Sequence, residues 1–199
     1  MCYMKKIFLT ALIACLAVTA FCQNTHLTFK GVPIDGTLTE YVNKMKAAGF
    51  THLTTEDGIA LMRGDFAGYK NCVIGVQTLK PRNLVHEITV IFPQQDEWSR
   101  LEGDYIKIKE MLTTKYGTPA KSNEEFVNTP IYVDIDRDDN KMRELRDGRC
   151  EYYSVFRLEN GRISLELRDT GFPYEAHIQL WYTDKDNEAV IEADAMNDL

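Results

Sequence analysis

The sequence predicts an α+β fold, in which two helix-plus-antiparallel-meander halves pack around a central amphipathic helix. Apolar residues recur at helical spacing through residues 96–119, and strand-like segments gather in runs before and after that stretch instead of alternating singly with helices. The halves should span about residues 27–93 and 94–199. The chain of 199 residues is 44% hydrophobic and 27% charged, which is an ordinary composition for one globular domain.

The first 22 residues have the layout of a secretory signal peptide. Lys5 and Lys6 precede the apolar run Ile7–Val18, and small side chains follow it. We therefore expect a signal peptide at residues 1–22 and a single mature α+β domain at residues 23–199. No later stretch approaches the ~20 apolar residues that a transmembrane helix needs, so no membrane span is expected.

Two processing sites compete within this segment. Cleavage after Ala20–Cys22 places small side chains where a signal peptidase reads them, and it would release an exported periplasmic or extracellular protein. Leu12–Cys15 instead resembles a bacterial lipobox, which would leave a lipoprotein anchored at Cys15. We favour the first site, because the lipobox would follow an unusually short apolar region and precede further apolar residues.

The charge balance argues against two classes of partner. The formal net charge is −7, and removal of Lys5 and Lys6 leaves −9. No basic stripe offsets this excess, so the chain should repel the phosphates of nucleic acids and the headgroups of anionic lipids. Nucleic-acid binding is therefore not expected.

Five cysteines are present, and three of them fall in the predicted signal peptide. Cys72 and Cys150 remain in the mature chain, one in each half. They either form one disulfide, which an oxidising compartment would allow, or stay as two separately buried thiols, since a free cysteine packs like a small apolar side chain.

The first half is expected to begin with a short strand and a turn in residues 26–37. Thr37 and Glu40 then form a capping box for a helix that ends at Gly49. Four strands separated by turn residues follow as an antiparallel meander. These strands are Thr51–Thr54, Ile59–Asp65, Asn71–Leu79 and Leu84–Phe92.

The central helix should begin at Asp96 or Ser99, and Ser99 with Glu102 has the spacing of a second capping box. Gly117 and Pro119 end it, because glycine favours the left-handed cap and proline lacks the N–H that would continue the helix. One apolar stripe runs along its length. The stripe consists of Trp98, Leu101, Tyr105, Ile108, Leu112 and Tyr116.

The second half begins less clearly. Residues 118–128 look irregular, Ile131–Asp134 reads as a short strand, and residues 136–147 form a charged loop or a short helix. Further on, Asn160 and Gly161 supply the left-handed residues of a tight hairpin turn. The remaining elements are strands at Arg149–Leu158, Ile163–Leu167 and Ala176–Thr183, and a closing acidic helix at Asp184–Asn197.

Two resemblances accompany these elements. The segment Phe29–Thr37 before a helix that ends at Gly49, together with Tyr116–Pro119 closing a second helix, resembles an uncharacterised family of secreted proteins from gut-dwelling Bacteroidetes. The tandem helix-plus-meander layout is similar to the β-lactamase-inhibitor-protein fold. The first resemblance rests on capping and turn residues that carry no activity. The second is topological, so it assigns no inhibitory role to any residue.

No motif in the sequence predicts a catalytic or cofactor site. The histidines are scattered singly, and the chain lacks a Gly-x-Ser-x-Gly elbow, a phosphate-binding glycine loop and a Cys-x-x-Cys pair. We therefore lean towards a non-enzymatic protein without a cofactor. An enzyme whose carboxylates and histidines meet only in the fold, and an envelope-associated structural protein, stay as alternatives. The histidines are His26, His52, His86 and His177.

A weak metal candidate lies in the charged segment of the second half. Asp134, Asp136 and Asp138 have the spacing of the first half of an EF-hand calcium loop. Asp139 stands where that loop needs glycine, and Leu145 where it needs a bidentate glutamate. We interpret the segment as a solvated charged loop, with weak calcium binding as the alternative.

The candidate binding residues lie on the polar phase of two strands. On the last strand, His177, Gln179 and Trp181 should face away from the core, and a tryptophan among polar neighbours is out of phase. Tyr153 and Arg157 fall on the polar phase of an earlier strand, so the five side chains form one patch if the strands pair side by side. Such residues suit either a protein partner or a carbohydrate.

The alternative is that Trp181 belongs to a second small core. The closing helix at residues 184–197, or the loop at residues 171–174, would then cover it. With an open Trp181 face, the sequence predicts an exported non-enzymatic binding protein.

Overall fold

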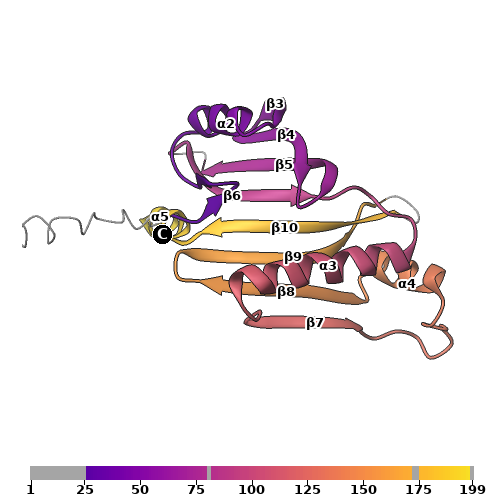
Figure 1. The fold of residues 1–199 in the computed structure, drawn as a ribbon. Coiled ribbons are helices and arrows are strands. Elements are labelled where there is room, and N and C mark those ends of the chain that lie inside the picture. Colours follow the sequence, from indigo (N-terminus) through magenta and orange to yellow (C-terminus); the bar gives the residue numbers. More distant parts are fainter. Residues whose placement is uncertain (1–25, 80–81, 172–174, 198–199) are drawn as a thin grey trace, which may run out of the picture.

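Two antiparallel meanders join edge to edge in the structure, a computed structural model that describes residues 26–79, 82–171 and 175–197 (Figure 1). They form one eight-stranded sheet with the strand order β3-β4-β5-β6-β10-β9-β8-β7. The predicted signal peptide lies outside the described residues. The strands are β3 (Thr51–Glu56), β4 (Ile59–Phe66), β5 (Tyr69–Leu79), β6 (Leu84–Ile91), β7 (Lys121–Phe126), β8 (Cys150–Leu158), β9 (Gly161–Asp169) and β10 (Ala176–Asp184).

The joint between the two meanders is the antiparallel pair of β6 with β10. Val90 lies opposite Leu180, and Ile88 lies opposite Tyr182. All four side chains are buried, so the two meanders share one continuous hydrophobic layer. The predicted α+β class with antiparallel strands is confirmed. The packing of two halves around a central helix is not confirmed, because the halves meet through this strand pair.

Four helices and one small hairpin complete the described part of the chain. The first helix α2 contacts strands β3 to β6, α3 contacts strands β8 to β10, and α4 packs beside α3. The last helix α5 crosses the ends of β6, β9 and β10 (Figure 1). The bounds are α2 (Leu38–Ala47), α3 (Trp98–Tyr116), α4 (Asp138–Arg146), α5 (Lys185–Asn197), and the hairpin strands β1 (Thr28–Phe29) and β2 (Val32–Pro33).

Helices α2 and α3 cover the same face of the sheet. Tyr105 of α3 shares a hydrogen bond of 2.9 Å with the hydroxyl of Ser154, which lies in the same cross-strand row as Leu165 and Leu180. Phe50, just after α2, packs against Phe29, whose ring is 5.3 Å from that of Tyr182 on this same face. We call this side the helix side and the opposite side the open face.

The ends of the two main helices follow the sequence only in part. Thr37 and Glu40 form the predicted capping box of α2, and Gly117 with a φ of 87° ends α3. The second capping box, at Ser99 and Glu102, is wrong. The N–H of Ser99 donates to the carboxylate of Asp138 over 3.2 Å, so a residue distant in sequence caps this turn.

Glu102 is used elsewhere, which explains why it does not cap α3. Its carboxylate accepts from the indole N–H of Trp98 over 3.0 Å and from the hydroxyl of Tyr152 over 2.7 Å. Trp98 is fully buried, and its ring centre lies 5.1 Å from that of Tyr152. Glu102 therefore satisfies the two polar atoms of an otherwise aromatic cluster between α3 and β8.

The start of the second half differs from the prediction. Residues Lys121–Phe126, predicted to be irregular, form the edge strand β7, and Ile131–Asp134, predicted to be a strand, lies in a turn region. The sequence KSNEEF has no apolar alternation, so its strand conformation comes from pairing with β8. The charged segment contains helix α4, and α5 confirms the predicted closing helix.

The hairpin between β8 and β9 also differs from its prediction. Leu158 pairs with Gly161, so Glu159 and Asn160 are the two turn residues. Neither Asn160 nor Gly161 has a positive φ. Gly161 is instead required for space, since a Cβ there would lie 2.4 Å from the backbone oxygen of Thr183.

Asp184 and Asn187 tie the beginning of the described chain to its last helix. The buried carboxylate of Asp184 accepts from the N–H of Leu27 over 2.7 Å and from the N–H of Asn187 over 2.9 Å. The side-chain amide of Asn187 donates to the carbonyls of Ile34 and Val85, each over 2.9 Å. These bonds satisfy backbone groups of β6, of α5 and of the segment around the first hairpin.

The disulfide alternative is not formed, and both Cys72 and Cys150 are free thiols. They lie in β5 and β8, which are four strand positions apart in the sheet, or roughly 19 Å at normal strand spacing. A disulfide needs Cα atoms within about 7 Å. Burial raises the pKa of Cys72 to about 11 and that of Cys150 to about 12, so both thiols are protonated at neutral pH.

None of the described helices is both long and apolar enough to cross a membrane.

Two glycines give opposite predictions for the same substitution. Gly161→Ala should destabilise the protein by about 1–3 kcal/mol, because the new methyl group meets the backbone of β10. Gly103→Ala should stabilise it by about 0.5–1 kcal/mol, because a Cβ at this position in α3 meets nothing within 4 Å and alanine is the better helix former. Urea unfolding of both variants checks the pair. Equal effects of the two substitutions would contradict the described register of β9 and β10.

Candidate binding surface on the open face of the sheet

The open face is defined by the strand residues that alternate with the buried ones. Trp181 lies near its centre, opposite Thr89 on β6 and Ser164 on β9. Helices α2 and α3 lie on the other side, and α5 crosses the strand ends. One cross-strand row therefore runs over the whole face. It contains Leu61, Gly75, Thr89, Trp181, Ser164, Val155 and Lys121.

Trp181 is half-buried, and its nearest partners across the strands are small. Thr89 and Ser164 flank it, so the indole ring stands above its neighbours in the row. The guanidinium of Arg168 lies 6.0 Å from the ring centre, within cation–π range. Arg168 thus lies over the face of the indole ring.

A shallow hollow of about 310 Å³ lies beside Trp181 on the open face. Its walls come from three strands and carry both signs of charge. The residues around it are Glu87, Arg162, Ser164, Glu166, Arg168, Trp181 and Thr183. Helix α5 starts only after β10, and residues 172–174, part of the loop named in the covered-core alternative, lie outside the described residues.

The five predicted binding residues do share this face, although not through direct strand pairing. His177 and Gln179 lie on β10 with Trp181, and Tyr153 lies on β8. Strand β9 separates β8 from β10, and its Glu166 is opposite both Gln179 and Tyr153. Arg157 of β8 lies opposite Arg162 of β9, and Arg162 lies opposite Thr183 of β10.

The polar residues of β9 occupy the middle of the patch, and none of them was among the predicted binding residues. Arg162, Ser164, Glu166 and Arg168 alternate with the buried Ile163, Leu165 and Leu167. That alternation is a readable signal for the open face. The sequence does not show that β9 lies between β8 and β10, because this position depends on the order of strands in the sheet.

Hydrogen bonds between neighbouring strands hold several of these side chains. The hydroxyl of Thr183 donates to Glu87 over 3.0 Å, and the amide of Gln77 donates to Glu87 over 3.1 Å and to Thr89 over 3.2 Å. Within β10, the ring atom Nε2 of His177 lies 3.3 Å from the side-chain Oε1 of Gln179. The polar groups are therefore oriented before any ligand arrives, which reduces the entropy lost on binding.

A second polar cluster lies on the helix side, between α3 and the edge strand β7. The ammonium of Lys109 donates to the hydroxyl of Ser122 over 2.9 Å and also to Glu124. Ser122 in turn lies 3.3 Å from Ser154, which bonds Tyr105. A lysine beside a serine is a known nucleophile–base pair. Here the ammonium serves as a donor to two groups, so the cluster fastens β7 to α3.

Two of the three carboxylates in the predicted metal candidate, those of Asp134 and Asp138, have protein partners. Asp134 accepts from the N–H of Asp136 over 3.1 Å, and Asp138 accepts from the N–H of Ser99. Asp139 forms an ion pair of 2.9 Å with Arg137. Among the described residues no group of three or more metal-type ligands converges.

No protein family, curated protein or solved structure matches the chain. The resemblance to secreted Bacteroidetes proteins and to the β-lactamase-inhibitor-protein fold therefore stays a prediction. The geometry of the open face is what indicates a function.

The acidic loop gives a prediction about calcium. Because Asp134 and Asp138 already accept from backbone N–H groups and Asp139 pairs with Arg137, titration calorimetry should detect no calcium binding in the micromolar range. Micromolar binding that Asp136→Asn abolishes would contradict this and make calcium a ligand of the protein.

Two half-buried histidines predict how stability changes with pH. Burial lowers the pKa of His86 and of His177 below 6.5, so each takes up a proton less readily in the folded chain than in the unfolded one. The unfolding free energy should therefore fall as the pH drops from about 7 to about 5. Urea unfolding at several pH values measures this, and the double variant His86→Gln, His177→Gln should show a smaller slope. An unchanged slope would show that other groups cause it.

Proposed function

We propose that this chain is an exported, non-enzymatic binding protein that docks a protein partner on the open face of its sheet. The observation that carries the proposal is Trp181, a half-buried tryptophan near the middle of a wide polar face with Arg168 beside its ring. Tryptophan, tyrosine and arginine are the residue types enriched at the energetic centres of protein interfaces.

The size and chemistry of the face favour a protein. Eight strands at about 4.8 Å spacing span roughly 34 Å, which is wide enough for the ~800 Å² that each partner contributes to a standard interface. Charges of both signs, such as Arg162, Glu166 and Arg168, surround Trp181. A partner with a matching pattern would gain specificity from these charges and most of its affinity from the aromatic centre.

Export is supported by the layout of the first 22 residues. Cleavage before Gln23 would release the domain into the periplasm or the medium, and the alternative of a lipid anchor at Cys15 would tether it to a membrane surface. Either route presents the open face to proteins outside the cytoplasm.

A carbohydrate is the second candidate ligand, and the hollow beside Trp181 favours it. A volume of about 310 Å³ is at the lower end of small-molecule sites, and its wall offers an indole ring with carboxylate, guanidinium and hydroxyl groups. A sugar could stack on Trp181 and bond to Glu166 and Arg168. The enzyme alternative has less support, because the nucleophile-like Ser122 faces a lysine that also bonds Glu124.

Replacement of Trp181 tests the proposal. Trp181→Ala should keep the melting temperature within a few degrees and weaken partner binding at least tenfold, since interface hot spots contribute about 2 kcal/mol or more. The measurement is quantitative mass spectrometry of proteins retained by the immobilised chain from native extracts, followed by direct titration of the purified candidate. A glycan array with the same two proteins tests the carbohydrate arm.

Two control variants make the test decisive. Met111→Ala removes an exposed apolar side chain from the helix side and should leave partner binding unchanged. Trp98→Ala removes the fully buried tryptophan and should cost about 3–5 kcal/mol. A loss of that size in Trp181→Ala would assign Trp181 to the core. Identical retained partners and glycans for the wild type and Trp181→Ala would refute the proposed site.

A further inference from the structure

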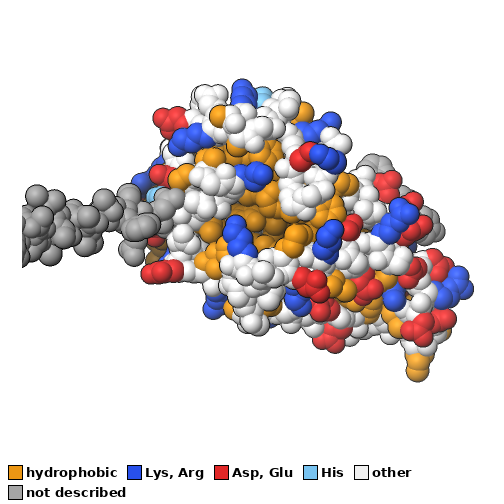
Figure 2. Space-filling model, in the orientation of Figure 1, with side chains coloured by type: hydrophobic (Ala, Val, Ile, Leu, Met, Phe, Trp, Pro, Cys, Tyr) orange, Lys and Arg blue, Asp and Glu red, His pale blue; other side chains and the backbone are white. Residues whose placement is uncertain are grey.

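An apolar hollow opens on the helix side, away from the proposed binding face. Figure 2 shows hydrophobic side chains exposed between the α2 half and α3, with basic side chains at the border of this area. Within it lies a cavity of about 130 Å³, which we call the helix-side cleft. Residues from the β4–β5 turn, α3 and β10 line the cleft. They include Phe66, Ala67, Met111, Tyr116, Leu180 and Tyr182.

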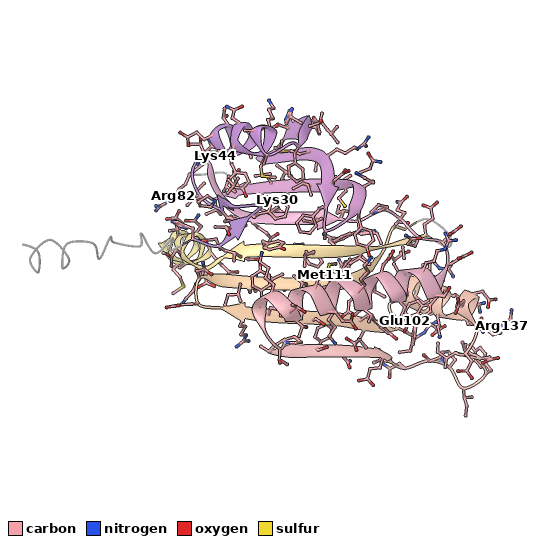
Figure 3. The ribbon with its side chains drawn as sticks, in the orientation of Figure 1. Lys30, Lys44, Arg82, Glu102, Met111 and Arg137 are labelled. Carbon is pink, nitrogen blue, oxygen red and sulfur yellow. The ribbon has the colours of Figure 1, made fainter. Side chains whose placement is uncertain are left out.

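The cleft combines an apolar wall with a positive rim. Lys115 lines it, and the ammonium of Lys115 lies 4.7 Å from the ring centre of Tyr116. In Figure 3, Lys30 on the β1–β2 turn and Met111 on α3 lie toward the middle of the helix side, from opposite halves of the molecule. This positive border stands out on a chain whose formal net charge is −7.

The size of the cleft limits what can enter it. A volume of about 130 Å³ equals that of roughly four water molecules in the liquid, and it is well below the 300–1,000 Å³ of drug-sized sites. One projecting aliphatic side chain fits such a space. The basic rim favours side chains that are carried on an acidic segment.

The chain itself carries a segment of that description. Ile131 and Tyr132 are its most exposed large hydrophobic residues among those described, at 103% and 85% of full exposure. The N–H of Val133 bonds the carbonyl of Pro130 over 2.9 Å, so the two side chains stand on a turn between β7 and α4. Figure 1 shows this connection projecting from the edge of the molecule. We call it the loop tip.

Acidic residues follow the loop tip directly. Four aspartates, at positions 134, 136, 138 and 139, stand against a single Arg137 in this segment. The loop tip projects and the cleft is concave, and both are apolar. The acidic residues beside the tip are complementary in charge to the lysine at the rim of the cleft. Exposed apolar residues of this kind mark interaction sites when they are not scattered singly.

The loop tip cannot serve the cleft of its own chain. Asp138, close to the tip, bonds the N–H of Ser99 at the first turn of α3. The cleft borders the other end of this helix, at Met111, Lys115 and Tyr116. The 12 residues from Ser99 to Met111 cover about 18 Å along the helix axis. With the loop in the conformation that the structure shows, a second molecule has to supply the tip.

We propose that the loop tip of one molecule inserts Ile131 into the helix-side cleft of a second copy of this chain, with Tyr132 against the rim of the cleft. The contact is head to tail, since each copy uses its tip towards one neighbour and its cleft towards another. Such heterologous contacts build rings when the rotation between neighbours closes and open chains of molecules when it does not. The open face of the sheet stays free in this arrangement, and the inference does not depend on the proposed function.

The predicted association is weak and depends on concentration. Two anchoring side chains with a charged border bury much less than the ~800 Å² per partner of a stable interface. Sedimentation velocity should give a monomer at about 20 μM and progressively faster species up to about 1 mM, with the increase reduced by high salt. Ile131→Asp should abolish the increase. Leu53→Asp, which changes an exposed leucine on the edge strand β3, should not.

A mixing experiment separates this contact from every symmetric one. The tip variant Ile131→Asp has an intact cleft, and the cleft variant Met111→Glu has an intact tip. Each should stay monomeric alone at about 1 mM, with the circular dichroism spectrum of the folded wild type. An equal mixture should form one-to-one dimers that cannot grow, because the free tip and the free cleft of each dimer are the mutated ones.

The outcomes decide the proposal without ambiguity. Dimers in the mixture and in neither variant alone support the tip-in-cleft contact. Wild-type protein that stays monomeric to about 1 mM overturns the proposal, because the tip-in-cleft contact should form at that concentration. Wild-type association without recovery in the mixture also overturns it, because the contact would then join two tips or two clefts.

Discussion

The pairing of β6 with β10 is the interaction on which the rest of the structure depends. It joins two meanders that are distant in sequence into one sheet, and its register places Val90 beside Leu180 and Ile88 beside Tyr182. Because side chains alternate along a strand, this register decides which residues of one meander share a face with those of the other. A shift by one residue would move Trp181 to the helix side and Leu180 to solvent.

The joined sheet gives the molecule two faces of different chemistry. On one side, α2 and α3 cover separate parts of the sheet, and the gap between them leaves an apolar hollow in which Lys115 and Met111 are reachable. On the other side, the polar phases of β8, β9 and β10 lie uncovered by these helices, with Trp181 near their centre. The two candidate surfaces are thus consequences of one topology, in which both helices pack on the same face.

Local elements could be predicted from the sequence where neighbouring residues determine them. The Thr37–Glu40 capping box and Gly117 act within one helical turn, and both were predicted correctly. The errors occur where a distant residue decides. Ser99 is not the cap of α3 because the helix begins at Trp98, and Asp138 accepts from the Ser99 N–H instead. Strand β7 forms from a polar sequence because β8 offers an edge for pairing. Neither partner is visible in the local pattern.

The candidate site shows the same division between local and distant information. The alternation within β10 was sufficient to place Trp181, Gln179 and His177 on the polar phase, since it involves only adjacent residues. The central position of β9 was not predictable, because strand order depends on the whole sheet. The exposure of the loop tip was the feature that the sequence predicted least well. Ile131 and Tyr132 look like part of a short strand, and only the fold shows that they have no core to join and stand exposed beside an acidic segment. A pair of apolar side chains in that position is costly to keep in water, which is the physical reason to expect that it binds a complementary surface.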